Sequence, residues 1–248
     1  HVLCEKPLGL SAAECLELAA AAARAGRVLM EAFMYRFHER SEALFDLVRG
    51  GGLGPLSLVR ARFAFTVSDP SNIRLQPSLG GGALRDVGCY CVNVARTLAG
   101  SEPESVQAHA RWTSQELDQQ GLEMGLAGTL RFGDGLVAQI ACALDEPRHE
   151  TLQVFGSEGY AEVGAAFLPG PGPVDFTLVT RRGGVQRVAF EGHDQYRSMV
   201  EHFQGALAQG LAPRYDALEA ARTAAVIEAL LRSARQDGKS VAVARVGA

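Results

Sequence analysis

Residues 80–96 read GGGALRDVGCYCVNVAR, and the rest of the chain is organised around this stretch. Three consecutive glycines free the backbone from the usual limits on φ, so another group can approach it closely. The apolar run that follows is long enough for a helix, with Asp86 expected at its N-cap or in its first turn. Tyr90 and Asn93 then follow on the same face, which predicts a carboxylate, a phenol and an amide in one stripe. The same pattern also fits an ordinary N-capping aspartate with a tyrosine packed behind it.

Composition and charge restrict the class of protein. The 248 residues suffice for one large domain, or one and a half, and 47% hydrophobic with 21% charged residues is typical of a soluble globular protein. The net charge of −4 and the absence of a long Lys/Arg run argue against nucleic acid and anionic membranes as partners. No stretch approaches the roughly 20 apolar residues that a transmembrane helix needs.

The five cysteines are scattered and include no CxxC pair. Cys89 and Cys91 lack a second cluster that would complete a zinc site, so no metal site is predicted. Reduced thiols favour a reducing compartment, and we expect a cytoplasmic protein. Because the sequence begins at His1 rather than at a methionine, we expect a truncated or processed start, which leaves a signal peptide open.

The N-terminal part reads as strand, helix, strand. Residues 1–4 form a buried strand that Pro7 ends, and Ser11 caps a helix that runs to about residue 25. Residues 27–34 read as a second buried strand. This order is the end of a parallel α/β unit, so we interpret residues 1–34 as the C-terminal remnant of a nucleotide-binding domain.

Residues 35–248 read as a second, α+β domain for substrate binding and oligomerisation. Alternation and glycine turns predict strands at 55–67, 106–112, 124–132, 136–144, 151–155, 161–163, 174–180 and 185–190. Two closing helices are predicted at 194–208 and 216–233. The predicted fold class is therefore α/β (α+β), a Rossmann-like remnant followed by a large, mostly antiparallel sheet with helices on one face.

Apolar residues on both faces of several strands predict self-association. Leu58-Val59 and Val137-Ala138 are examples, since neighbours along a strand point to opposite faces. An uncovered apolar face of that size would promote association, so we expect it to pack against a second subunit.

An ordered set of motifs runs along the chain. These motifs are Glu5-Lys6-Pro7, EAFMYRFH at 31–38, GGGxxxDxGxY at 80–90, GSEG at 156–159 and YRxMVxHF at 196–203. The set closely resembles the Gfo/Idh/MocA oxidoreductase family over essentially the whole chain. The resemblance implies hydride transfer between NAD or NADP and a CH–OH group of a sugar, polyol or dihydrodiol. It also implies a small carbohydrate-like substrate and a homodimer or homotetramer formed through the open sheet face.

The resemblance also implies roles for individual residues. Lys6 would lie near the nicotinamide and the reacting oxygen, and Asp86 would bind substrate hydroxyls or orient its neighbours. Tyr90 stands where the branch with glucose–fructose oxidoreductase and the xylose and dihydrodiol dehydrogenases has tyrosine. A phenol with a pKa of about 10 is a poor base at neutral pH, and a nearby ammonium would lower that pKa. We therefore expect Lys6 and Tyr90 to act as an acid/base pair with Asp86 beside them.

The remaining site predictions are contacts. Cofactor contacts are expected at Glu5, Lys6 and Pro7, and substrate contacts at Tyr35, Arg36, Arg85 and Asn93. No segment matches the family's G-x-G-x-x-G loop, which would hold the cofactor's pyrophosphate at a helix N-terminus. A second hypothesis is therefore a truncated, non-catalytic sugar-binding or dimerisation module.

Overall fold

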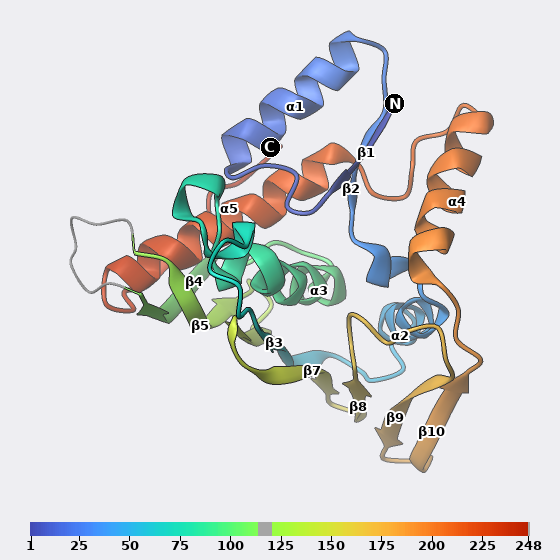
Figure 1. The fold of residues 1–248 in the computed structure, drawn as a ribbon. Helices are drawn as coiled ribbons and strands as arrows, with labels where there is room; N and C mark the ends of the chain where they lie inside the picture. The colour runs from blue at the N-terminus through green and yellow to red at the C-terminus, as the bar shows by residue number, and fades with distance from the viewer. Residues whose placement is uncertain (114–120, 248) are drawn as a thin grey trace.

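Strand β1 (Val2–Glu5) pairs in parallel with β2 (Leu29–Ala32), and helix α1 (Ala12–Arg24) connects them. This is a computed structural model, which describes residues 1–113 and 121–247 (Figure 1). The side chain of Ser11 accepts a hydrogen bond from the backbone of Glu14 at 3.1 Å, so α1 begins where the capping signal predicts. The unit is the parallel strand–helix–strand arrangement expected from the sequence.

The rest of the chain forms a nine-stranded sheet in the order β10-β9-β8-β7-β3-β6-β5-β4-β11. Neighbouring strands pair antiparallel, apart from β3 and β6, which pair in parallel. The predicted fold class is confirmed. The strands are β3 (Leu56–Thr66), β4 (Ser105–Trp112), β5 (Glu123–Arg131), β6 (Val137–Ala143), β7 (Asp145–Gly156), β8 (Gly159–Gly164), β9 (Val174–Thr180), β10 (Gly184–Phe190) and β11 (Val241–Ala242).

Helices cover one face of this sheet. The principal helices are α2 (Glu39–Arg49), α3 (Cys89–Ala99), α4 (Gln195–Ala208) and α5 (Ala217–Arg235). In Figure 1, α3 and α5 lie against the strands at the centre of the molecule, where they contact β3, β4 and β6. Every second residue of β3 points toward them, and Val59, Ala61 and Phe63 are buried as a result. The apolar core lies in this layer.

The other face of the sheet is only partly apolar, which corrects the sequence prediction. Leu58 and Val137 are paired neighbours on this face, and the row continues through Phe155, Tyr160 and Val179. The rows beside it are mostly polar: Arg60, Gln107, His109, Thr129, Gln139, Thr151 and Gln153. The prediction overstated the apolar area because strand alternation gives a residue's face but not its cross-strand neighbours.

Helix α5 also supports the N-terminal unit. Leu8 and Cys15 form a small core with Ala217, Ala221 and Ala224 of α5, and Figure 1 shows α1 and α5 side by side. The segment that follows β1 is thereby fixed against the last helix of the chain. Among the helices that the structure describes, none has the length and apolar character needed to span a bilayer.

Candidate active site

A cavity of about 690 Å³ opens beyond the carboxyl end of β1. Its walls come from β1, the end of β3, the segment before α3, α3 itself and α4. The lining residues are Glu5, Lys6, Pro7, Leu10, Phe63, Phe65, Ile73, Arg74, Leu79, Gly80, Gly81, Gly82, Arg85, Asp86, Val87, Tyr90, Arg148, Leu168 and Tyr196. The volume lies within the range of small-molecule sites.

Lys6 and Asp86 form the charged centre of this cavity. Lys6 Nζ lies 3.0 Å from Asp86 Oδ1 and also donates a hydrogen bond to the Asp86 backbone carbonyl at 2.5 Å. Burial by itself lowers the pKa of Lys6, but Cys89, Asp86 and the hydrogen bond to Asp86 together raise that pKa above its ordinary value. Lys6 is therefore an ammonium at neutral pH.

Asp86 lies in a wide π turn, η4 (Leu84–Gly88), that runs directly into α3. The helix begins before Asp86, so the carboxylate belongs to the first turn, and its side chain caps no backbone N–H. A π turn inside a helix is typical of functional sites, because it displaces side chains from the regular helical spacing.

Tyr90 lies beside Lys6, but the geometry differs from the expected acid/base pair. Lys6 Nζ lies 5.0 Å from the centroid of the Tyr90 ring, which is a cation–π contact, whereas the hydroxyl donates to Met34 Sδ at 3.5 Å. Burial raises the pKa of Tyr90 well above its usual value. The expected lowering of this pKa was wrong, because the phenol is desolvated by burial.

Arg74 is a site residue that the sequence analysis missed. Its Nε donates to Asp86 Oδ2 at 2.7 Å, so Asp86 bridges Lys6 and Arg74 with one carboxylate oxygen each. The residue belongs to the short turn η2 (Ile73–Leu75), which lies between the strand predicted at 55–67 and the glycines at 80–82. Nothing in the local sequence indicates that its side chain reaches Asp86.

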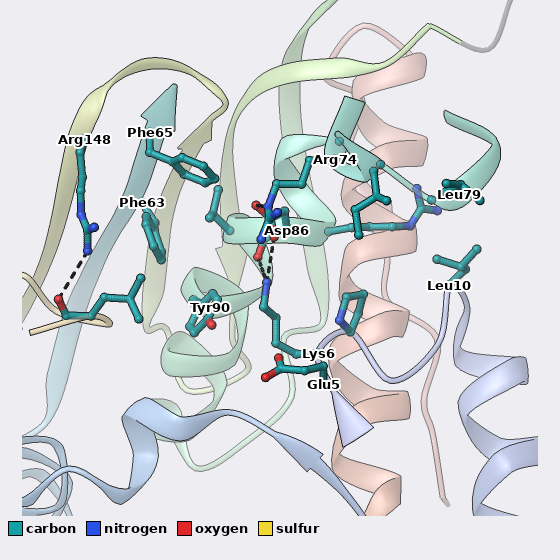
Figure 2. Close-up of a pocket in the computed structure, with 18 of the residues that line it drawn as sticks. Glu5, Lys6, Leu10, Phe63, Phe65, Arg74, Leu79, Asp86, Tyr90 and Arg148 are labelled. Carbon is teal, nitrogen blue, oxygen red and sulfur yellow. Dashed lines mark hydrogen bonds and ion pairs between the residues drawn. The ribbon is translucent and has the colours of Figure 1, made fainter. Parts of the chain in front are cut away.

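Further residues reach the cavity. Figure 2 shows Glu5 next to Lys6 at the base of the cavity, with Phe63 and Phe65 of β3 and Arg148 of β7 along one side. Arg85 and Tyr196 also line the cavity. Of the expected contacts, Glu5, Pro7 and Arg85 therefore line the cavity. Phe63 and Phe65 form an aromatic wall that strand alternation alone did not identify as part of the site.

Three expected substrate contacts lie elsewhere. The Tyr35 hydroxyl donates to Asn93 Oδ1 at 2.7 Å, and Asn93 is fully buried. Arg36 Nη2 donates to Glu219 Oε1 at 2.7 Å, and its guanidinium lies 4.0 Å from the Tyr215 ring centroid. These side chains join η1 (Met34–Phe37) and α3 to α5, away from the cavity lining. The stripe ends at Tyr90, because Asn93 is turned toward the protein interior.

The position of the cavity fits the nicotinamide end of a dinucleotide. Glu5, Lys6 and Pro7 follow a strand of the parallel β1–β2 pair, and α/β folds bind nucleotides beyond the carboxyl ends of such strands. Within residues 1–113 and 121–247, no group of three or more His, Cys, Asp and Glu side chains could hold a metal ion.

Comparison with known sequences gives consistent matches. The profile of the GFO/IDH/MocA C-terminal domain matches residues 42–162. D-xylose 1-dehydrogenase (NADP(+)) 2 of Haloferax volcanii is 35% identical over 94% of this chain and 70% of its own length. Trans-1,2-dihydrobenzene-1,2-diol dehydrogenase of Mus musculus is 32% identical over 68% of this chain and 49% of its own length.

Solved structures agree with these matches. Aldose–aldose oxidoreductase from Caulobacter crescentus, complexed with glycerol, superimposes with a TM-score of 0.89 at 30% identity, covering 98% of this chain and 72% of that one. A 3-ketoreductase from Actinomadura kijaniata with NADP and TDP-benzene gives 0.85 at 26% identity, covering 94% and 70%. Structures of that reductase include a Lys-to-Ala and a Tyr-to-Phe variant, at positions as far apart in sequence as Lys6 and Tyr90.

Proposed function

The chain belongs to the GFO/IDH/MocA oxidoreductase family, and we propose that it transfers a hydride between NAD or NADP and a CH–OH group of a carbohydrate-like substrate. The observation that carries this proposal is the Lys6–Asp86 pair in a cavity beyond a parallel strand pair. Similar proteins act on D-xylose, a dTDP-linked sugar and a dihydrodiol, which supports a small polyhydroxylated substrate.

Lys6 is the proposed proton donor and acceptor. A bound nicotinamide cofactor supplies or accepts the hydride, and Glu5, Lys6 and Pro7 would hold its nicotinamide end. In reduction, the carbonyl oxygen takes a proton from Lys6 Nζ as the carbonyl carbon gains the hydride. In oxidation, the neutral amine of Lys6 takes the hydroxyl proton. The Tyr90 ring holds the ammonium through its face, while Asp86 keeps it charged.

The electrostatics of the site favour reduction at neutral pH. The pKa of Lys6 is raised, so its side chain is protonated at neutral pH and can donate to a carbonyl oxygen. Oxidation needs a base that takes the hydroxyl proton, and Asp86 is not free for this because its two carboxylate oxygens are already paired with Lys6 and Arg74. We propose that alkaline pH is needed for efficient oxidation.

The hypothesis of a non-catalytic module is not favoured, because the named relatives are dehydrogenases and reductases. We propose residues 1–34 as the end of a Rossmann-type nucleotide-binding domain and residues 35–248 as the substrate domain. All five cysteines are free thiols, which supports a reducing compartment such as the cytoplasm.

A second copy of the chain is the proposed partner of the open sheet face. The row from Val137 through Leu58, Phe155 and Tyr160 to Val179 presents apolar side chains across neighbouring strands, and the Phe155 and Tyr160 rings stack at 5.5 Å. Apolar and aromatic side chains with polar residues beside them are a usual composition of a subunit interface.

The function is tested with the full-length protein. We expect oxidation of NADPH or NADH when aldose or ketose sugars, dihydroxyacetone or diketones are supplied, and cofactor reduction with polyols and aldoses at alkaline pH. Lys6→Ala should lower kcat of both reactions by about 10² to 10⁴. Failure of the wild-type protein to turn over either cofactor with any of these compounds would refute the proposal.

A further inference from the structure

We propose that Arg74 is a positioning residue of the active site, which holds one oxygen of Asp86 so that the other faces Lys6. The inference rests on the proposed function, because it concerns how Lys6 is kept in place for proton transfer. It adds a residue that neither the sequence motifs nor the comparisons indicate.

Each carboxylate oxygen of Asp86 is held by one cationic side chain. Arg74 Nε lies 2.7 Å from Oδ2 and Lys6 Nζ lies 3.0 Å from Oδ1 of Asp86. The terminal torsion of an aspartate is broad and imposes little direction on its carboxylate by itself. A second cation on the far oxygen therefore restricts the rotation that would move Oδ1 away from Lys6.

The turn that carries Arg74 is firmly held. The backbone N–H of Arg74 donates to Asn72 Oδ1 at 3.0 Å, and its carbonyl accepts from the backbone of Gly82 at 2.9 Å. The guanidinium lies 5.9 Å from the Phe65 ring centroid. The Arg74 side chain thus starts from a fixed backbone and extends along an aromatic wall.

The turn that carries Arg74 packs closely against the glycine cluster Gly80–Gly82. A Cβ at Gly81 would lie 2.5 Å from the Arg74 carbonyl oxygen, and a Cβ at Gly80 would lie 2.3 Å from the Leu10 side chain. Leu10 belongs to the segment that carries Lys6. The close approach that the glycines permit is therefore made by the chain's own Arg74 and Lys6 segments, which meet at Asp86.

Arg74 also changes the balance of charge at Lys6. The groups that face Lys6 are Asp86 and Cys89 from η4 and α3, the Tyr90 ring, Arg74 from η2, and Tyr196 from α4, with Glu5 preceding it in β1. Asp86 favours the ammonium form, whereas Arg74 opposes it. A lysine that must both hold and release a proton needs this opposition, since Asp86 alone would retain the proton more strongly.

The first experiment is a double-mutant cycle on the full-length enzyme. We expect Arg74→Gln to lower kcat roughly 10- to 100-fold with little change in KM, because the reacting group is misplaced. In an Asp86→Asn background the same substitution should cost nothing further. Gly81→Ala should reproduce the Arg74→Gln effect, and Arg74→Lys should restore part of kcat. Additive losses, or a KM increase that persists in the Asp86→Asn background, would overturn the proposal.

The second experiment does not depend on turnover. The 248 residues contain two lysines, Lys6 and the exposed Lys239, and the Lys6 ammonium signal in a ¹H–¹⁵N NMR spectrum of the full-length protein is assigned by its loss in Lys6→Arg. We expect a slowly exchanging Lys6 signal in the wild type and in Arg49→Gln, which removes an exposed pair with Asp46. The signal should be lost or broadened in Arg74→Gln and Gly81→Ala.

The two experiments separate the inference from the proposed function. A Lys6 signal that depends on Arg74 in a protein without oxidoreductase activity would retain the positioning role and refute the function. An active enzyme whose Lys6 signal is unchanged in Arg74→Gln would refute the positioning role alone.

Discussion

Lys6 Nζ contacts Asp86 Oδ1 at 3.0 Å across 80 residues of sequence, and both side chains are nearly buried, with 10% and 13% of their surface exposed. The pair joins the end of the parallel unit to the first turn of the helix after the glycines. The contact therefore brings together the two motifs that dominate the sequence.

Replacement of Lys6 should lower turnover strongly. We expect Lys6→Ala to lower kcat by about 10² to 10⁴, the usual effect of losing an acid/base group. Lys6→Arg keeps the charge but cannot release its proton near neutral pH, so it should remain impaired in oxidation. Steady-state kinetics with Lys239→Ala as the control tests this; equal losses for both lysines would contradict it.

The two reaction directions should differ in their pH dependence. The pKa of Lys6 lies above its ordinary value, so the ammonium persists through the neutral range and the reductive rate should stay level there. At pH values below that pKa, the fraction of Lys6 in the neutral amine form rises tenfold with each unit of increasing pH. The oxidative kcat/KM should therefore rise steadily from pH 7 toward pH 10. The pH profiles of kcat/KM in both directions provide the measurement. A level oxidative profile would show that Lys6 is not the base.

The hydroxyl of Tyr90 should matter less than its ring. Because that hydroxyl bonds to Met34 Sδ, Tyr90→Phe should change kcat less than about tenfold, well below the loss of a true acid. Tyr90→Leu removes the face beneath Lys6 and the packing against Phe33, Phe63 and Phe167, so it should lower both kcat and Tm. A large kcat loss in Tyr90→Phe with unchanged Tm would restore the phenol as the acid.

Local signals predicted the elements well, because caps and turns depend on adjacent residues. Ser11 caps α1 as expected, and Gly133-Asp134-Gly135 joins β5 to β6 between the two strands predicted there. The family resemblance also implied that Lys6 lies near Asp86 and Tyr90, and all three line one cavity. The role of Arg74 could not be predicted, since the turn carrying it is placed by tertiary contacts with the glycines.

Helical spacing predicts on which face of a helix a residue lies, but not which side chains of other elements it contacts. Asn93 follows Tyr90 by one turn, yet it points to Tyr35 and Thr223 rather than to the cavity. Arg36 was expected to contact the substrate, but it forms an ion pair with Glu219, 183 residues away. Such long-range partners depend on the packing of α5, which the local sequence does not encode.

The open sheet face should control the oligomeric state. Phe155→Asp places a charge in the centre of the apolar row, where burial against a second subunit would be costly. We expect the wild-type protein to be a dimer or tetramer by light scattering and Phe155→Asp to be monomeric with its circular dichroism unchanged. Gln107→Asp, in the polar part of the same face, should leave the mass unaltered. A monomeric wild type at micromolar concentration would exclude this interface.

Glu219 should make stability depend on pH. Its carboxylate accepts hydrogen bonds from Arg36 and Arg96, two buried arginines, at 2.7 and 3.1 Å. Burial by itself raises the pKa of Glu219, but the two guanidinium groups outweigh it and lower that pKa to about 2.

The sign of the effect follows from proton linkage. The pKa of Glu219 is lower in the folded protein than in the unfolded chain, so its stabilisation is fully present above about pH 4.5 and is lost as the pH falls toward 2. We expect Glu219→Gln to lower the free energy of unfolding by about 3 kcal/mol at pH 7, because two buried arginines lose their counter-charge. Urea unfolding should show the difference from wild type shrinking between pH 5 and pH 3. Glu201→Gln, which removes an exposed pair with Arg197, should change stability little at any pH. A Glu219→Gln deficit that stays constant as the pH falls would mean that packing, rather than charge, makes this residue important.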